Sequence, residues 1–125
     1  LFLLALAALC GCLDRQEPPR AGFSSEKVEE RRQALGRGLY AHYCAHCHGE
    51  SGAGDGLNAY ALPVKPPDFS SRAWQESRTD AALEDFIRLG GRLSGRSPLC
   101  PALGTSSSER VLYLRCYLRS LARGT

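Results

Sequence analysis

The sequence predicts an all-α domain, and three observations carry that prediction. Apolar residues recur at helical spacing in three separate segments, the pattern of amphipathic helices that share one core. No segment of useful length alternates between apolar and polar residues, as a half-buried strand would. The chain has 125 residues, of which 43% are hydrophobic and 23% charged, so it forms one small globular domain at most.

Residues 1–12 are predicted to be an export signal rather than part of the fold. Leu1 to Leu9 form an uncharged apolar run, too short to span a bilayer and suited to the centre of a signal peptide. Since neither an initiator Met nor a basic region precedes it, we expect the sequence to start inside the signal. The segment Leu9-Cys10-Gly11-Cys12 resembles the bacterial lipobox, which implies that Cys12 is lipidated and begins the mature protein. Cys10 departs from the usual small residue, and a soluble export signal with two incidental cysteines is the alternative.

Residues 13–25 are polar, contain Pro18-Pro19 and lack periodicity, so they are predicted to tether the domain to the membrane. The domain itself is assigned to residues 26–123. Ser25 is predicted to cap its first helix, which runs to about Tyr43 and starts with a glutamate-rich turn. The apolar stripe of this helix is predicted to consist of Val28, Leu35 and Leu39.

The helix leads into a C-x-x-C-H sequence formed by Cys44, Cys47 and His48, the pattern of a c-type haem attachment site. Two thiols three positions apart lie on one short turn and can add to the two vinyl groups of one porphyrin edge. The imidazole that follows can then bind the iron axially. The alternatives are a redox C-x-x-C or half of a zinc site. No second Cys or His pair follows downstream, and the preceding residues are helical in pattern rather than a buried strand.

Two more histidines flank the attachment residues. His42 precedes Cys44 by two positions, and His46 lies at a motif position that usually faces solvent. Neither position brings a nitrogen to the opposite face of the same haem. Both are therefore predicted to be surface histidines.

Residues 49–69 are predicted to lack long helices. Gly49 to Gly56 form a glycine-rich loop, and no helix with Lys-Ser/Thr follows it, which argues against a phosphate cradle. Asn58 to Leu62 are predicted to form a short helical turn. Val64 to Phe69 are predicted to be extended because each Pro restricts the residue before it. One carbonyl of this stiff segment is expected to accept a hydrogen bond from Nδ1 of His48.

Two further helices complete the domain. Thr79 or Asp80 is predicted to cap a second helix that ends at Gly90-Gly91, and a loop follows from Arg92 to Leu103. Ser106 and Glu109 are predicted to form a capping box at the start of the last helix. The predicted core-facing residues of the two helices are Leu83, Phe86, Ile87, Val111, Leu114, Tyr117, Leu118 and Leu121.

From about Gly36 to Leu121 the chain resembles the class I monohaem c-type cytochromes, in particular the small exported bacterial kind. The resemblance rests on the segments Gly36–Tyr40, Cys44–Gly56, Pro67–Phe69, Ile87–Gly90 and Tyr117–Leu121. It implies a cytochrome c fold of three to four short helices wrapped around one covalently bound haem c. Cys44 and Cys47 would supply the thioethers and His48 an axial iron ligand. It also implies that the first and last helices cross with Gly36 against Tyr117.

The chain departs from that family at the second axial position. The family uses a Met in a loop reading Ser-Pro-x-Met-Pro-Ala-x-Gly, whereas this chain has no Met and carries Cys100 at the corresponding place. A thiolate donates more electron density than a thioether, so ligation by Cys100 would lower the reduction potential. The alternatives are a disulfide between Cys100 and Cys116, formed in an oxidising periplasm, or an open site with an unligated thiol.

The expected function is one-electron transfer by a periplasmic, lipid-anchored cytochrome c that exchanges electrons with redox protein partners. The sequence offers no catalytic constellation and is not expected to be an enzyme. No nucleic-acid-binding pattern appears, and the formal net charge of +3 requires no such partner. The alternatives are a haem-based sensor of a gas or other ligand, or the haem subunit of a sulfur-oxidising or other redox complex, with an open or thiolate-ligated iron.

Overall fold

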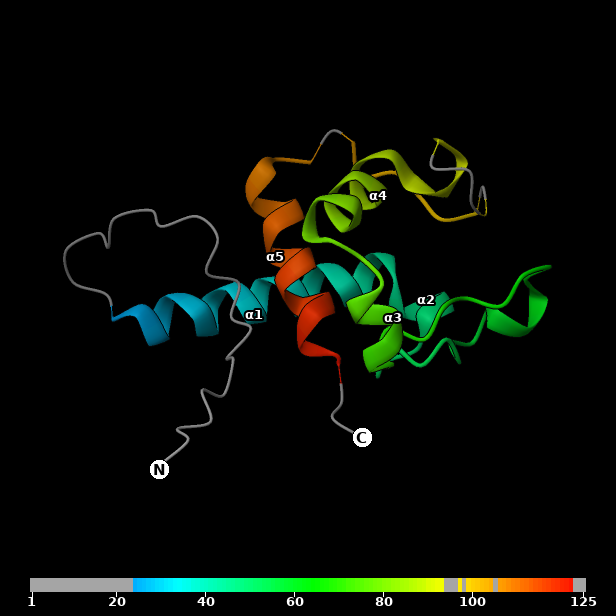
Figure 1. The fold of residues 1–125 in the computed structure, drawn as a ribbon, viewed down its shortest axis with the longest axis horizontal. Coiled ribbons are helices and arrows are strands. Elements are labelled where there is room, and N and C mark those ends of the chain that lie inside the picture. The colour runs from blue at the N-terminus through cyan, green and yellow to red at the C-terminus, as the bar shows by residue number, and fades with distance from the viewer. Residues whose placement is uncertain (1–23, 94–96, 98, 105, 123–125) are drawn as a thin grey trace, which may run out of the picture.

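The computed structural model describes residues 24–93, 97, 99–104 and 106–122. This part of the chain contains helices and no strands, which confirms the all-α prediction (Figure 1). Its elements are α1 (Ser25–Tyr43), α2 (Ala45–His48), the 3-10 turn η1 (Ala59–Ala61), α3 (Arg72–Glu76), α4 (Asp80–Leu93) and α5 (Ser108–Ser120). The predicted signal with Cys12, the tether up to residue 23, and Pro98 lie outside the described residues. No described helix is both long and apolar enough to cross a bilayer.

Helices α1 and α5 cross at close range and frame the domain (Figure 1). Gly36 lies at the crossing, where a Cβ atom added to it would lie 2.7 Å from Cβ of Tyr117 and would overlap the carbonyl oxygen of Tyr113. Only a glycine allows the two backbones to approach this closely. The predicted meeting of Gly36 with Tyr117 is therefore confirmed.

The crossing also determines which face of α1 is buried. Gly36 and Tyr40 are the buried residues of this helix, while Leu35 keeps 42% of its surface exposed. Successive residues of a helix are rotated by about 100°, so turning Gly36 toward α5 turns Leu35 away from it. The prediction that Leu35 belongs to the core-facing stripe of α1 was therefore wrong. The cap was predicted one residue late, because the hydroxyl of Ser24 accepts the hydrogen bond from the Lys27 amide.

Helix α5 supplies most of the core. Its residues Val111, Leu114 and Leu118 are buried, as is Leu121 directly after it, and Tyr117 packs against them from its half-buried position. The predicted capping box of Ser106 and Glu109 was wrong by one residue. The Ser107 hydroxyl caps the helix by accepting from the Arg110 amide, while the Ser106 amide donates to the Leu103 carbonyl at 2.7 Å in a preceding turn.

Helix α4 begins as predicted, with the Thr79 hydroxyl accepting a hydrogen bond from the Ala82 amide at 3.1 Å. Leu83 and Ile87 are buried on its inner face. The helical path breaks at Gly90, which has φ 67° and ψ −179°, and helical hydrogen bonding then continues to Leu93. The predicted stop at Gly90-Gly91 is thus a kink within α4.

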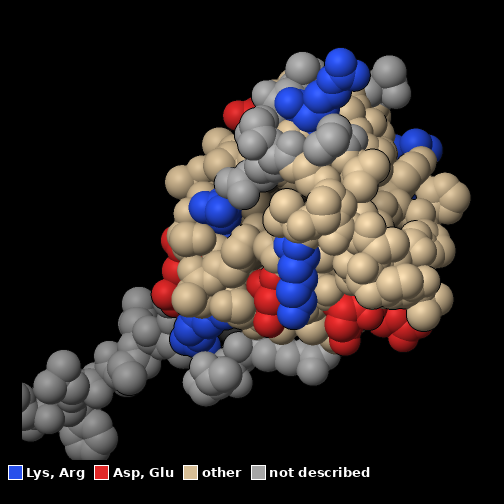
Figure 2. Space-filling view, turned by 90° about the vertical axis from the view of Figure 1, so that its right-hand side faces the viewer, with Lys and Arg blue, Asp and Glu red and all other residues tan. Residues whose placement is uncertain are grey.

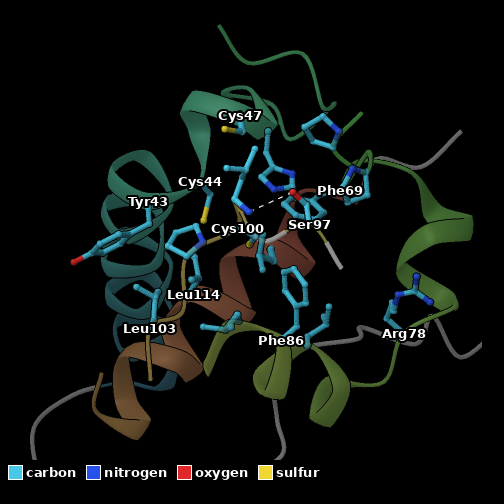
Figure 3. Close-up of a pocket in the computed structure, with 18 of the residues that line it drawn as sticks. Tyr43, Cys44, Cys47, Phe69, Arg78, Phe86, Ser97, Cys100, Leu103 and Leu114 are labelled. Atoms are coloured by element: carbon cyan, nitrogen blue, oxygen red, sulfur yellow. Dashed lines mark hydrogen bonds between the residues drawn. The ribbon is translucent and has the colours of Figure 1, made fainter. Parts of the chain in front are cut away.

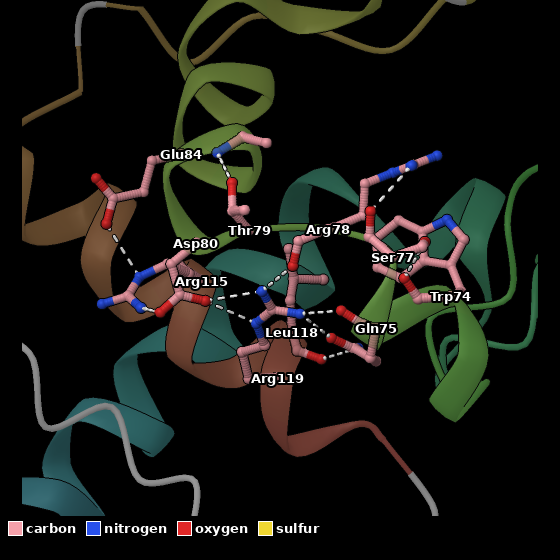
Figure 4. A network of polar contacts seen from close by, with 11 residues as sticks. Trp74, Gln75, Ser77, Arg78, Thr79, Asp80, Glu84, Arg115, Leu118 and Arg119 are labelled. Atoms are coloured by element: carbon pink, nitrogen blue, oxygen red, sulfur yellow. Dashed lines mark hydrogen bonds and ion pairs between the residues drawn. The ribbon is translucent and has the colours of Figure 1, made fainter.

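A polar network fastens α5 to α3 and to the start of α4 (Figure 4). The Arg115 side chain, only 3% exposed, forms ion pairs with Asp80 and with Glu84. Arg119 donates from Nε to Asp80 at 2.8 Å and from Nη1 to the backbone carbonyl of Gln75 at 2.7 Å. Because two carboxylates face two guanidinium groups, the buried charge of Arg115 is compensated.

Candidate haem site

The attachment motif lies on a single tight turn at the end of α1. The Cys44 amide still donates to the Tyr40 carbonyl at 2.8 Å, so Cys44 continues the hydrogen bonding of α1. The Cys44 carbonyl in turn accepts from the amides of Cys47 at 3.1 Å and His48 at 2.9 Å. Since residues three apart share one face of a helical turn, both thiols lie on the same side of the backbone.

The glycine-rich loop folds back onto this turn. The Gly54 amide donates to the His48 carbonyl at 2.8 Å, and the Gly56 amide donates to the Cys47 carbonyl at 3.2 Å. A Cβ atom at Gly56 would lie 2.6 Å from the carbonyl carbon of Cys47, so no side chain fits there. The buried hydroxyl of Tyr40 donates to the Gly49 carbonyl at 2.7 Å and ties the loop to α1. The loop thus holds the motif turn in place.

His48 projects from the turn into the interior. Its ring stacks on the ring of Phe69, with a centroid separation of 4.2 Å and an interplanar angle of 16°. Its Nδ1 atom is buried without a hydrogen bond of normal geometry. Burial lowers the pKa of His48, an effect opposed by the nearby carbonyl of Pro67. The imidazole is therefore neutral at neutral pH, the form that binds a metal. Pro67 belongs to the extended segment in which an acceptor for Nδ1 was expected.

A cavity of about 680 Å³ opens beside His48 (Figure 3). It is enclosed by the end of α1, α2, residues 62–69, α3, α4, the loop around Cys100, and α5. Its size lies within the range of about 300–1,000 Å³ that is usual for cofactor pockets. Most of the lining is apolar: Leu62, Val64, Pro66, Pro67, Phe69, Trp74, Leu83, Phe86, Ile87, Leu89, Leu99, Pro101, Leu103, Leu114 and Leu118.

Three thiols reach this one cavity: those of Cys44, Cys47 and Cys100. Burial raises the pKa of Cys44 to about 12, and the neighbouring Cys100 and Cys47 thiols add to the shift. Burial likewise raises the pKa of Cys100. The thiols of Cys44 and Cys100 are therefore neutral at neutral pH, as suits their apolar surroundings.

Cys100 is held at the cavity by main-chain contacts between its loop and α4. The Gly91 amide donates to the Cys100 carbonyl at 3.1 Å, and the Leu103 amide donates to the Ile87 carbonyl at 2.9 Å. At Gly90 an added Cβ atom would lie 2.7 Å from the Ala102 amide nitrogen, so the loop approaches α4 closely. The structure thus brings Cys100 together with the attachment residues.

The remaining predicted site residues lie elsewhere. His42 and His46 are exposed, as predicted. Cys116 is 1% exposed, lies in the core face of α5, and is not among the described residues that line the cavity. Within the described part of the chain, no three His, Cys, Asp or Glu residues form a group that could hold a metal ion by themselves.

The donors and the cavity fit a covalently held haem. Two thiols on one turn would supply the thioether bonds, and the neutral imidazole of His48 would bind the iron. Cys100 would offer a sulfur as a second axial donor. Such a group would supply reversible one-electron chemistry at iron inside an apolar enclosure.

Some lining residues were not foreseen from the sequence. Trp74, the single Trp of the chain, lies in α3 and packs on Phe69 at 4.8 Å between ring centroids. Arg78 follows α3, and its guanidinium lies 5.8 Å from the centre of the Trp74 ring. The sequence did contain one sign of α3, because serine commonly caps helices, and the Ser71 hydroxyl caps this one by accepting a hydrogen bond from the Trp74 amide. A helix of five residues is too short to show the apolar periodicity that reveals longer helices.

Comparison with known protein families gives one match over most of the described domain. The family model described as cytochrome C oxidase, cbb3-type, subunit III matches residues 31–108, well over half of the chain. No curated protein matches the sequence. The matched residues include the motif turn, the glycine-rich loop, α3, α4 and Cys100.

Proposed function

Because the chain belongs to the family described as cytochrome C oxidase, cbb3-type, subunit III, a class I c-type cytochrome domain with one covalently bound haem c, we propose that it is an exported carrier of single electrons between redox proteins. The convergence of Cys44, Cys47 and His48 on one apolar cavity carries this proposal. His48 is the proximal ligand of the iron, and the two cysteines hold the haem.

The composition of the cavity favours electron transfer over catalysis. Asp85 is the single carboxylate among the described lining residues, so no pair of acidic groups is available for general acid–base work. The walls come from helices α2, α3, α4 and α5, from residues 62–69 and from the loop around Cys100, and most of the side chains that they present are apolar. An apolar enclosure of this kind favours a carrier over an enzyme, because it offers few groups for acid–base chemistry.

The surface near the cavity favours a protein partner. Leu57, Tyr60 and Val64 are 81%, 89% and 67% exposed, and Leu89 and Leu99 are also exposed. Figure 2 shows the side of the molecule at the right of Figure 1 as a largely uncharged surface with scattered charged side chains. Apolar surface on a soluble domain is characteristic of contact with other proteins.

We assign Cys100 as the distal ligand of the ferric iron, bound as thiolate. The support is its place in the cavity wall and the main-chain contacts that hold its loop on α4. A ferric iron lowers the pKa of a coordinating thiol and so overcomes the upward shift that burial causes. Electron paramagnetic resonance of the ferric protein is expected to show the narrow low-spin signal of thiolate ligation. A high-spin signal, or a Cys100–Cys116 crosslink found by mass spectrometry, would contradict the assignment and leave the haem attachment standing.

Optical spectra with and without carbon monoxide test the proposed function against ligand sensing. The purified protein should show reversible one-electron reduction and the spectrum of a haem c resistant to acid–acetone extraction. Its ferrous form should bind carbon monoxide slowly at neutral pH, since Cys100 and its loop close the distal side. Rapid binding would favour the sensor, a candidate raised by the absence of Met from the chain.

Membership of a larger oxidoreductase complex is a second candidate, favoured by the description of the matched family as an oxidase subunit. Purification from mild detergent distinguishes the two. A carrier should elute alone, whereas a subunit should co-elute in fixed stoichiometry with other redox proteins.

We further propose periplasmic export and lipid anchoring at Cys12, which rest on the apolar run and the lipobox-like residues at the start of the sequence. Cys12→Ala should release the haem protein from the membrane fraction, and Cys10→Ala is the matched control that should leave it bound. Equal partitioning of both variants would contradict the anchor.

A further inference from the structure

The orientation of the His48 ring is restricted by an aromatic neighbour as well as by the nearby carbonyl of Pro67. Rotation of an imidazole about its Cβ–Cγ bond is only loosely restricted by the side chain itself. Metal-binding histidines are commonly fixed by a hydrogen bond from the second ring nitrogen. Nδ1 of His48 is buried, and its contact with the Pro67 carbonyl falls outside normal hydrogen-bond geometry, so this contact holds the ring only weakly. The nearly parallel ring of Phe69, at 4.2 Å between ring centroids, packs on the face of the imidazole and opposes its rotation.

Phe69 is itself held from several sides. The Tyr40 ring lies edge-on to it at 6.5 Å and 68°, and the Trp74 ring lies at 4.8 Å and 52°. The Phe69 side chain is buried at 5% exposure. Its amide donates to the Gly52 carbonyl at 2.7 Å, which ties its backbone to the loop after the motif.

Gln75 connects Phe69 to the rest of the domain. This side chain is 6% exposed, and its Nε2 donates to the carbonyl of Phe69 at 2.7 Å and to that of Leu118 at 2.8 Å. Its Oε1 accepts from Arg119 Nη1 at 2.9 Å (Figure 4). Both amide hydrogens and the oxygen are used, so the side chain bridges α3, the Phe69 backbone and α5 in one geometry.

We propose that Phe69, anchored through Gln75 to α5, is a positioning residue that sets the plane of the His48 imidazole at the iron. The inference rests on the proposed role of His48 as proximal ligand. Phe69 touches the ligand, and Gln75 acts through Phe69. The network in Figure 4 thereby extends from the exposed ion pairs of Asp80 to the haem ligand.

The test uses proton magnetic resonance of the ferric holoprotein with cyanide as the sixth ligand. Cyanide replaces the distal donor and is symmetric about its axis, so the imidazole plane alone sets the order of the shifted haem methyl signals. The parent protein should show strongly shifted His48 ring protons, which establishes ligation by His48 separately. Phe69→Leu, which keeps an apolar side chain without a ring, is expected to change the methyl order. Phe69→Tyr should restore the parental order because it keeps the ring.

Gln75→Leu is a second, independent variant, which leaves the Phe69 ring in place. It removes both donors and should shift the methyl signals in the same direction as Phe69→Leu, by a smaller amount. Val111→Ala is the control for lost stability, because Val111 is 1% exposed in the core and is not among the residues that line the cavity. It should lower the melting temperature with the parental methyl order unchanged.

Two results would overturn the inference. One is a parental methyl order in Phe69→Leu or Gln75→Leu, which would show that the residues serve stability alone. The other is an equal change in Val111→Ala, which would show that any loss of packing moves the ring. Absence of shifted His48 ring protons in the parent would instead contradict the proximal ligand assignment.

Discussion

Cys100 lies on a loop whose backbone is attached to α4 through the Gly91 amide and through the Leu103 amide. The sulfur is therefore placed by main-chain contacts that do not involve its own side chain. If Cys100 binds the iron as proposed, a substitution at this position would change the donor atom and leave these backbone contacts in place. The reduction potential is the property most sensitive to that atom, because the axial ligand is one of the main controls on haem iron.

Cys100→Met is expected to replace a thiolate with a thioether. The ferric spectrum should gain the weak sulfur-to-iron band of His/Met haems, and the potential should rise by on the order of hundreds of millivolts. Optical redox titration measures both. Cys100→Ser is the matched comparison, which should leave a weakly held site that binds cyanide faster. A potential that is equal in all three proteins would exclude Cys100 from the iron.

Asp68 contributes a pH-dependent stability at the segment before α3. Its carboxylate accepts hydrogen bonds from the hydroxyl of Ser70 at 2.6 Å and from the Ser70 amide at 2.8 Å. These bonds, the hydroxyl first, lower the pKa of Asp68 below its usual value. The stabilisation is therefore present above the unfolded-state pKa and is lost as the pH falls through the lower folded-state pKa.

Asp68→Asn should accordingly lower the melting temperature at neutral pH, and the difference from the parent should shrink on acidification. Melting followed by circular dichroism at a series of pH values measures it. Ser70→Ala, which keeps the amide donor, should show part of the same effect. A difference that does not vary with pH would show that the charge of Asp68 is not the cause.

At the scale of the elements, the contact between α1 and α5 depends on one missing side chain. Gly36 faces the α5 backbone, whereas an added Cβ atom at Gly38, two residues later in the same helix, would meet nothing within 4 Å. The two glycines therefore carry the same cost in helix propensity and differ only in what they face.

Gly36→Ala is expected to lower the free energy of unfolding by about 1–3 kcal/mol, because the new methyl group pushes the helices apart. Gly38→Ala should be neutral or stabilising by up to about 1 kcal/mol, because alanine favours the helix. Guanidinium denaturation of the two holoproteins gives both values. Equal destabilisation by the two substitutions would contradict the close crossing.

Asp80 links the N-terminus of α4 to Arg115 and Arg119 of α5. Asp80→Asn is expected to cost about 1–2 kcal/mol, a modest value because Asp80 is 47% exposed although Arg115 is buried. Glu30→Gln, at an exposed position of α1, is the control and should change stability little. Denaturation at low and high salt separates the contribution of the ion pairs to stability, which salt weakens, from the local effect of the substitution on the start of α4. An unchanged stability in Asp80→Asn would show that Glu84 alone compensates Arg115.

At the scale of the whole molecule, a cavity of about 680 Å³ lies among the packed elements. Helices α4 and α5 turn apolar faces toward it, and with 14 and 13 residues both are too short to be stable alone. The haem would supply the apolar contacts that these faces otherwise lack.

The double variant Cys44→Ala, Cys47→Ala should lose its haem to acid–acetone and should lack most of its helical circular dichroism signal. The matched single variant Cys116→Ala, in the core but away from the cavity, should retain both haem and helicity. A compact, helical double variant without haem would refute the view that the haem is the centre of the core.

The parts of this structure that were predictable are those with a periodic or motif signal. The three longer helices and the attachment turn followed from such signals, whereas the meeting of Gly36 with Tyr117 followed from the resemblance to the class I c-type cytochromes. Helix α3 did not, because five residues show no period. The caps at Ser24 and Ser107 were missed by one residue because adjacent serines give equivalent signals, and tertiary contacts decide between them.

Buried polar residues were the least predictable feature. Arg and Gln are residue types that usually lie at the surface, and the sequence around Arg115 and Gln75 contains no sign that these side chains are buried. Their burial depends on partners that are distant in sequence, such as Asp80 for Arg115 and Leu118 for Gln75. The role of Phe69 beside His48 was equally hidden, since it arises only when the extended segment folds across the motif turn.

The backbone attachment of the distal loop has a consequence for the evolution of this chain. Hydrogen bonds between amides and carbonyls are indifferent to side-chain identity, and those of Gly91 and Leu103 would persist whatever residue occupied position 100. If Cys100 binds the iron as proposed, a different residue at that position would exchange the donor atom without altering these two backbone contacts. The reduction potential of the domain would then change through position 100 alone, while the rest of the fold is retained.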